Sequence, residues 1–167
     1  DNVTNLPYGD PAAPAMPGSG GSLSTGAANA RGGQLGGGAI KIDVGTGKVR
    51  VDGILRANSS DDGFHNTGAG GGLWLVCGQF EGAASGLIQA RGGNIGSAGR
   101  SPGAGGRIAV NWSGTSTYAG NYDVSGGADP QVRGQPGTLW LPPGANLAVR
   151  APYKVGVPPG SHTFGAI

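Results

Sequence analysis

The sequence contains little charge, one cysteine and no long apolar run. Asp, Glu, Lys and Arg make up only 12% of the 167 residues, against roughly 25% in ordinary soluble domains. The net charge is +2 and the basic residues are scattered, so nothing indicates a nucleic-acid partner. The single cysteine, Cys77, excludes an internal disulfide and is expected to be a small strand residue. No stretch approaches the roughly 18 apolar residues of a spanning helix, so we expect no membrane span.

Glycine and proline, by contrast, are abundant. The chain has 38 Gly and 12 Pro, which together reach the roughly 30% at which disorder is usually expected. A hydrophobic content of 37%, in evenly spaced aliphatic clusters, argues against disorder and for one folded domain. The chain begins at Asp1 rather than Met, which indicates a processed chain or a fragment. Both readings favour an extracellular or cell-surface location.

A glycine-led phrase recurs along the chain. It occurs four times, at residues 36–42 (GGGAIKI), 70–76 (GGGLWLV), 105–110 (GGRIAV) and 137–141 (GTLWL). Counted from the last glycine of each copy, the steps are 34, 34 and 31 residues. A second phrase begins at Gly53, Gly86 and Gly120, at steps of 33 and 34 residues. Two independent phrases on one period indicate a repeat protein.

Each repeat has the same predicted order of elements. In the first repeat we expect strands at 38–44, 48–51 and 54–57, with a polar turn between the first two. A Gly-rich loop then closes each unit, at residues 59–71, 92–105 and 126–137. No segment shows helical periodicity, and glycine at this density destabilises helices. The sequence therefore predicts an all-β fold.

The exact period distinguishes between two all-β architectures. A β-sandwich needs no exact long repeat, whereas a parallel β-helix, or β-solenoid, stacks one coil per repeat about 4.8 Å apart. The glycine count predicts two inward-facing apolar columns, Ile40, Trp74, Ile108, Leu139 and Ile42, Val76, Val110, Leu141. It places Lys41, Leu75, Ala109 and Trp140 on the outward face. We expect a β-solenoid of about three to four coils with extended, Pro-rich terminal arms.

The chain is expected to have three parts. Residues 1–20 contain four prolines and read as an extended N-terminal arm. Residues 21–141 form the glycine-rich β-solenoid. Residues 142–167 form C-terminal strands and a tail, in which two alternating stretches, 146–150 and 153–157, are strand candidates.

The order of these motifs resembles a known architecture. Three glycines, an aliphatic-aromatic strand, a Gly-Gly loop and the sequence Gly-Gly-Arg-Ile-Ala-Val resemble the glycine-rich β-helix repeats of large secreted and cell-surface bacterial adhesin-like proteins. The likeness covers about residues 36–141. It implies a β-solenoid and an extracellular location, and it carries over no catalytic residue.

Few residues could carry chemistry. Asp61 and Asp62 with His65 form the best constellation, because polysaccharide-cleaving β-helices use clustered acids on such loops. The same residues also suit a polar turn with local hydrogen bonds or, less readily, a metal site, and the equivalent positions of the later loops are uncharged or basic. We expect the turn, and therefore no enzyme, no cofactor and no metal. The Gly-rich loops lack Gly-Lys-Ser/Thr, so their glycines are expected to permit tight stacking of loop on loop.

The two ends of a solenoid suggest a function. Terminal coils expose unpaired strand edges, which the terminal segments could cap on their own subunit or pair with the next one. Our leading hypothesis is a structural subunit of an extracellular filament or surface layer, with copies of itself as partners. The residues expected to mediate assembly are Val3, Leu6, Tyr153, Val155, Val157, Phe164 and Ile167. The alternative is a carbohydrate-binding or adhesive module that contacts a surface polysaccharide through Trp140, Trp112 and Tyr118.

Overall fold

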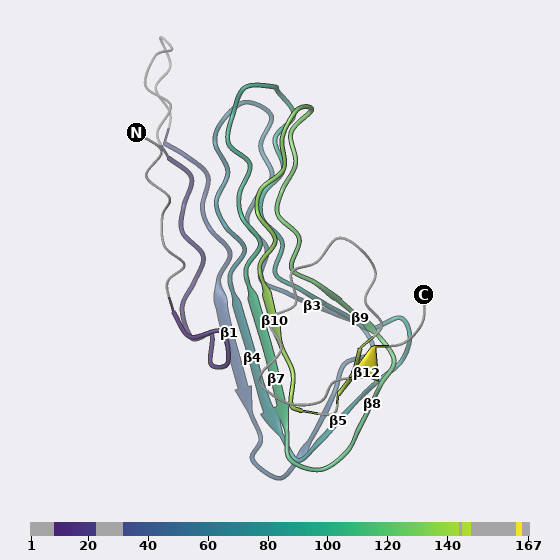
Figure 1. Cartoon of the computed structure of the whole chain (residues 1–167). Helices are drawn as coiled ribbons and strands as arrows, with labels where there is room; N and C mark the ends of the chain where they lie inside the picture. Colours follow the sequence, from purple (N-terminus) through teal and green to yellow (C-terminus); the bar gives the residue numbers. More distant parts are fainter. Residues whose placement is uncertain (1–8, 23–31, 144, 148–162, 165–167) are drawn as a thin grey trace.

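A computed structural model describes residues 9–22, 32–143, 145–147 and 163–164. Within these ranges the chain contains no helix, and every pairing between its strands is parallel. The chain winds as a β-solenoid of about three turns, with long loops reaching out from one corner (Figure 1). The predicted all-β parallel solenoid is therefore confirmed.

Three parallel sheets form the walls of the solenoid. The first contains β1 (Ala39–Asp43), β4 (Gly72–Cys77), β7 (Arg107–Trp112) and β10 (Thr138–Trp140), in that order. The second contains β2 (Lys48–Arg50), β5 (Gln79–Gly82) and β8 (Ser116–Tyr118). The third contains β3 (Ile54–Arg56), β6 (Leu87–Gln89) and β9 (Asn121–Asp123). Each coil thus contributes one strand to each wall, as the repeat predicts.

The core lies between the three walls. Alternate side chains of each strand point inward, because successive residues of a strand face opposite sides. The inward side chains of the middle coils are fully buried and include Leu73, Leu75, Phe80, Ile88, Ile108 and Val110. Cys77 is buried among them, as a small strand residue. The short apolar clusters of the repeat are therefore the inner layer of each coil.

The register corrects one sequence prediction. Gly72 pairs with Ala39, so Leu73 pairs with Ile40 and Leu75 with Ile42. Leu73 and Leu75 are fully buried, whereas Trp74 and Val76 are half-buried on the outer face. The prediction that Trp74 and Val76 point inward and Leu75 outward was wrong. The outward positions of Lys41, Ala109 and Trp140 are consistent with the observed pairing.

Gly72 caused the error, because it belongs to the strand rather than to the preceding loop. The glycine that stacks on Gly38 is Gly71, whose Cβ, if present, would lie 1.8 Å from the Gly38 carbonyl oxygen. A Cβ on Gly72 would lie 2.4 Å from the carbonyl oxygen of Pro14. Gly72 is thus glycine because an N-terminal segment crosses the sheet at that point.

This N-terminal segment, residues 9–22, packs on its own chain. The Asn111 side-chain amide donates to the Ala12 carbonyl at 3.2 Å, and Pro14 is buried. Further along, Gly18 N–H donates to Gly37 O and Gly21 N–H to Gln34 O, both at 2.8 Å. The described part of the predicted 1–20 arm therefore lies against the solenoid, and residues 1–8 lie outside the described residues.

The Gly-rich loops form arms that run out from the third strand of one coil and return to the first strand of the next (Figure 1). At the base of each arm the two legs share a backbone hydrogen bond of 2.7–2.8 Å: Gly71 N to Ala57 O, Gly106 N to Ala90 O and Gly137 N to Val124 O. Of the described glycines only Gly9, Gly45 and Gly99 have positive φ. A Cβ on Gly103 would lie 1.7 Å from Gly68 O, in the neighbouring coil. The arm glycines therefore provide space, which confirms the predicted stacking of loop on loop.

The C-terminal stretch is described only in part. β11 (Asn146–Leu147) falls within the predicted strand 146–150 and pairs in parallel with β12 (Thr163–Phe164). The strand candidate 153–157 lies outside the described residues, so it stays a prediction.

Candidate functional site

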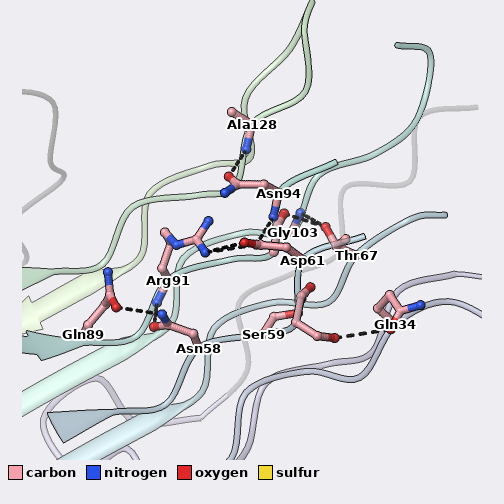
Figure 2. A network of polar contacts seen from close by, with 12 residues as sticks. Gln34, Asn58, Ser59, Asp61, Thr67, Gln89, Arg91, Asn94, Gly103 and Ala128 are labelled. Atoms are coloured by element: carbon pink, nitrogen blue, oxygen red, sulfur yellow. Dashed lines mark hydrogen bonds and ion pairs between the residues drawn. The ribbon is translucent and has the colours of Figure 1, made fainter. Parts of the chain in front are cut away.

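The polar side chains of the arms form ladders between coils (Figure 2). Asp61 accepts a hydrogen bond from the backbone N–H of Asn94 at 2.8 Å, and Asn94 Oδ1 accepts from the N–H of Ala128 at 3.0 Å. Arg91 Nη2 lies 3.0 Å from each oxygen of Asp61. Each side-chain oxygen thus accepts an N–H of the next coil, where a strand would use a carbonyl. This ladder holds consecutive arms together.

A second ladder follows the outer face of the third wall. Arg56 Nε donates to Gln89 Oε1 at 2.9 Å, and Gln89 Nε2 donates to Asp123 at 2.6 Å. These three residues are also paired in the backbone register. Asn58 donates to Gln89 Oε1 at 2.7 Å and accepts from Arg91 N–H at 2.8 Å (Figure 2). The polar groups satisfy one another, so this face is built for inter-coil cohesion.

Thr67 is one of the few polar side chains buried inside an arm. Its hydroxyl donates to Gly93 O at 2.6 Å and accepts from Gly103 N–H at 2.9 Å. Both bonds cross to the next coil, which satisfies the hydroxyl and compensates for its burial. Sequence reasoning missed Thr67, because its partners lie in glycine runs that give no side-chain signal.

The acidic constellation of the first arm is divided between different partners. Asp62 Oδ1 accepts from the N–H groups of Phe64 at 2.6 Å and His65 at 2.9 Å, and it lies 3.1 Å from His65 Nδ1. Asp61 instead faces Arg91 and Asn94. These are the local hydrogen bonds expected of a polar turn, extended to the next coil. In the described part of the chain, no three His, Cys, Asp or Glu side chains are grouped so that they could hold a metal ion.

The electrostatics of these two carboxyls suit structure rather than acid catalysis. Burial raises the pKa of Asp61, but hydrogen bonds from Arg91 and from Asn94 N–H outweigh it and hold the pKa below its ordinary value. The N–H groups of Phe64 and His65 lower the pKa of Asp62. A general acid of a glycosidase needs a raised pKa. Neither carboxyl has one.

The lowered pKa values predict acid sensitivity. Six aspartates have pKa values below the ordinary one because of hydrogen bonds or ion pairs: Asp43, Asp52, Asp61, Asp62, Asp123 and Asp129. The unfolded chain binds protons more readily, so their stabilisation is present above the unfolded pKa and is lost as the pH falls through the folded pKa. We expect Tm, measured by circular dichroism, to be flat near neutrality and to fall below about pH 5. A Tm that holds or rises down to pH 3 would contradict this.

Two of the three aromatic residues proposed for glycan contact lie in a cluster packed against the core. Phe80 stacks on Trp112 with ring centroids 5.9 Å apart and contacts Tyr118 at 4.7 Å. Tyr118 in turn contacts Tyr122 at 5.2 Å. Burial raises the pKa of the Tyr118 hydroxyl to about 12. Trp112 and Tyr118 therefore contribute to packing, the role that competed with glycan contact.

Trp140 lies apart from that cluster, on the outer face of the first wall. It pairs with Ala109, which pairs with Trp74, and Lys41 precedes Trp74 in the same row. Lys41 Nζ lies 4.2 Å from the centroid of the Trp74 ring, within the range of a cation–π contact. Sequence reasoning missed Trp74 as an outer residue because of the register error.

The end of the solenoid formed by the first coil is open in the described part of the chain. β1, β2 and β3 each have a neighbouring strand only on the side of the second coil. Ile54 is 60% exposed and Leu35 is 80% exposed. Leu55 is only partly buried, whereas its partner Ile88 in the second coil is fully buried.

Most residues proposed for assembly lie outside the described residues: Val3, Leu6, Tyr153, Val155, Val157 and Ile167. Phe164 lies in β12, where only its backbone is described. Their role in assembly therefore stays a prediction.

Comparison with known proteins identifies no relative. No protein-family model matches the chain, and neither a curated protein nor a solved structure matches it. The solenoid implied by the resemblance to glycine-rich repeats is present, while kinship with adhesin-like proteins stays a prediction. No helix in the described ranges is long and apolar enough to cross a membrane.

Proposed function

We propose that the chain is a structural subunit of an extracellular filament or surface layer, which assembles head-to-tail by strand addition at its ends. The observation that carries the proposal is the open first coil. β1 presents a five-residue edge with no strand beside it in the described residues, and it forms a parallel ladder with β4 on its other side. An unpaired edge of this kind is a template for another strand.

The repeat makes such addition favourable. A strand from another copy would extend the sheet through the same hydrogen bonds that join the first two coils, and it would cover side chains such as Ile54. A contact between two different ends of identical subunits does not close on itself, so it produces a fibre rather than a dimer. The acidic side chains support a non-enzymatic role, because those of the arms are engaged in ladders and turns.

Electron microscopy and sedimentation of the purified chain test the proposal. We expect regular fibres from the full chain and none after deletion of residues 1–12 or 161–167, because each deletion removes a terminal segment. The matched control is the full chain with a short Gly/Ser extension at either end, which should still assemble. Unchanged polymerisation of both deletion variants would refute assembly through terminal strands.

Trp140 favours the second candidate, a carbohydrate-binding or adhesive module for a surface polysaccharide. Its indole is half-buried on the outer face, in one row with Trp74, and aromatic faces of this kind suit sugar rings. A monodisperse monomer that binds glycans, and that loses binding in Trp140→Ala, would support this candidate over the filament.

A further inference from the structure

The outer face of β4 and β7 is shaped to receive the N-terminal segment. Three residues form this docking face: Gly72 leaves room for the segment, Ala109 is fully buried although it points outward, and Asn111 holds Ala12 O. A Cβ on Gly72 would lie 2.4 Å from Pro14 O and 2.8 Å from Met16 O. A carbonyl at that distance excludes any side chain at position 72, so Gly72 is matched to the segment that covers it.

The segment continues from the docking face onto the first leg of the arms. Gly18 N–H bonds to Gly37 O and Gly21 N–H to Gln34 O, so residues 18–21 run antiparallel to residues 34–37. The packing is close, because a Cβ on Gly36 would lie 2.1 Å from Gly18 O. Residues 23–31, LSTGAANAR in sequence, are the only covalent connection between the segment and the solenoid. Figure 1 shows the segment running beside the first wall.

We propose that the docking face also accepts the N-terminal segment of a second copy, so that segments are exchanged between subunits. This inference rests on the proposed function and names the surface that would join the subunits. The contacts of the segment with Gly72, Asn111 and Gly37 are the same whichever copy supplies it, so exchange needs no new interface. Pro11, Pro14 and Pro17 restrict the free segment to extended conformations, which lowers the entropy cost of docking.

The connection determines which copy is bound. A short flexible linker holds a tethered segment at an effective concentration of about millimolar, so micromolar protein favours docking on its own chain. A linker that cannot reverse direction removes this advantage. Replacing residues 23–31 by three prolines provides such a linker, because a polyproline stretch is extended and stiff. Replacing them by a nine-residue Gly/Ser linker is the matched control.

Cross-linking between two chains tests the exchange. Ala12→Cys is placed in one chain and Asn111→Cys in another, both with the three-proline linker, and the two are refolded together and treated with a short bismaleimide. We expect a covalent dimer from the mixture, and an intramolecular link when both cysteines share one chain with the Gly/Ser linker. Cys77 is buried, so the unaltered chain should not react.

Gly72→Val, added to either mixture, should abolish the cross-link, because its side chain would collide with Pro14 O. Circular dichroism then verifies that the solenoid remains folded. A three-proline chain that stays monomeric, without an intermolecular cross-link, would overturn the exchange. Fibres of the unaltered chain without any cross-link would leave the filament standing and refute this surface as its joint. Cross-linked dimers without fibres from the unaltered chain would support the exchange and refute the filament.

Discussion

Gly71→Ala is expected to remove at least about 4 kcal/mol of unfolding free energy, a large fraction of the roughly 5–15 kcal/mol of an ordinary domain. The added Cβ would lie 1.8 Å from Gly38 O and 2.7 Å from Gly37 C, both backbone atoms of the neighbouring coil. Backbone cannot rotate away as a flexible side chain can. The two coils would have to separate, at the expense of the hydrogen bond from Gly72 N–H to Gly38 O. Urea unfolding followed by circular dichroism measures the loss.

The control lies in the same glycine column, one coil earlier. A Cβ on Gly38 would have no atom within 4 Å, and neither Gly38 nor Gly71 has positive φ. Gly38→Ala should therefore be neutral or stabilising by up to about 1 kcal/mol, because alanine restricts the unfolded chain. The contrast separates steric room from backbone conformation, which is unstrained for alanine at both sites. Equal losses from the two substitutions would show that the coils do not stack this closely.

The sequence was sufficient to predict the architecture because a solenoid repeats one local problem. The strands predicted at 38–44, 48–51 and 54–57 appear as β1, β2 and β3, each within the expected range. Their stacking follows from the period alone. The role of the arm glycines was also predictable, because a loop so rich in glycine is typical of close backbone approach.

The register was harder to predict, since the glycine that misplaced it answers to a distant segment. Gly72 is constrained by Pro14 and Met16, almost sixty residues earlier, and no local pattern reveals that contact. One signal was nevertheless present. The second phrase steps by 33 residues from Gly53 to Gly86, and the observed step from Ala39 to Gly72 is also 33. The two phrases disagreed by one residue, and the one without the extra glycine was correct.

The ladders of the candidate site lay beyond prediction for a different reason. Asp61 and Asn94 occupy equivalent positions of successive coils, yet their partners are backbone N–H groups that every residue type provides. Asn58 and Gln89 bond diagonally, which a column alignment does not reveal. The aromatic cluster shows the same limit. Trp112 and Tyr118 meet through Phe80, a residue of the preceding coil.

Leu75→Ala is expected to destabilise the protein by about 2–5 kcal/mol, the range for a buried leucine. Leu75 is fully buried and stands in the inner column between Ile42 and Val110. Truncation leaves a cavity that the rigid stack of strands cannot close, because both neighbours are held by backbone ladders. Thermal and urea unfolding measure the effect.

Val76→Ala is the matched comparison, one residue further along β4. Val76 is half-buried on the outer face, where it pairs with Asp43 and Asn111, so its truncation should cost no more than about 1 kcal/mol. Since side chains of a strand alternate, a shift of one residue would exchange these two costs. A larger loss from Val76→Ala than from Leu75→Ala would restore the register given by the glycine count. It would also remove the reason for Gly72 to lie beneath the N-terminal segment, because that position would then belong to the arm.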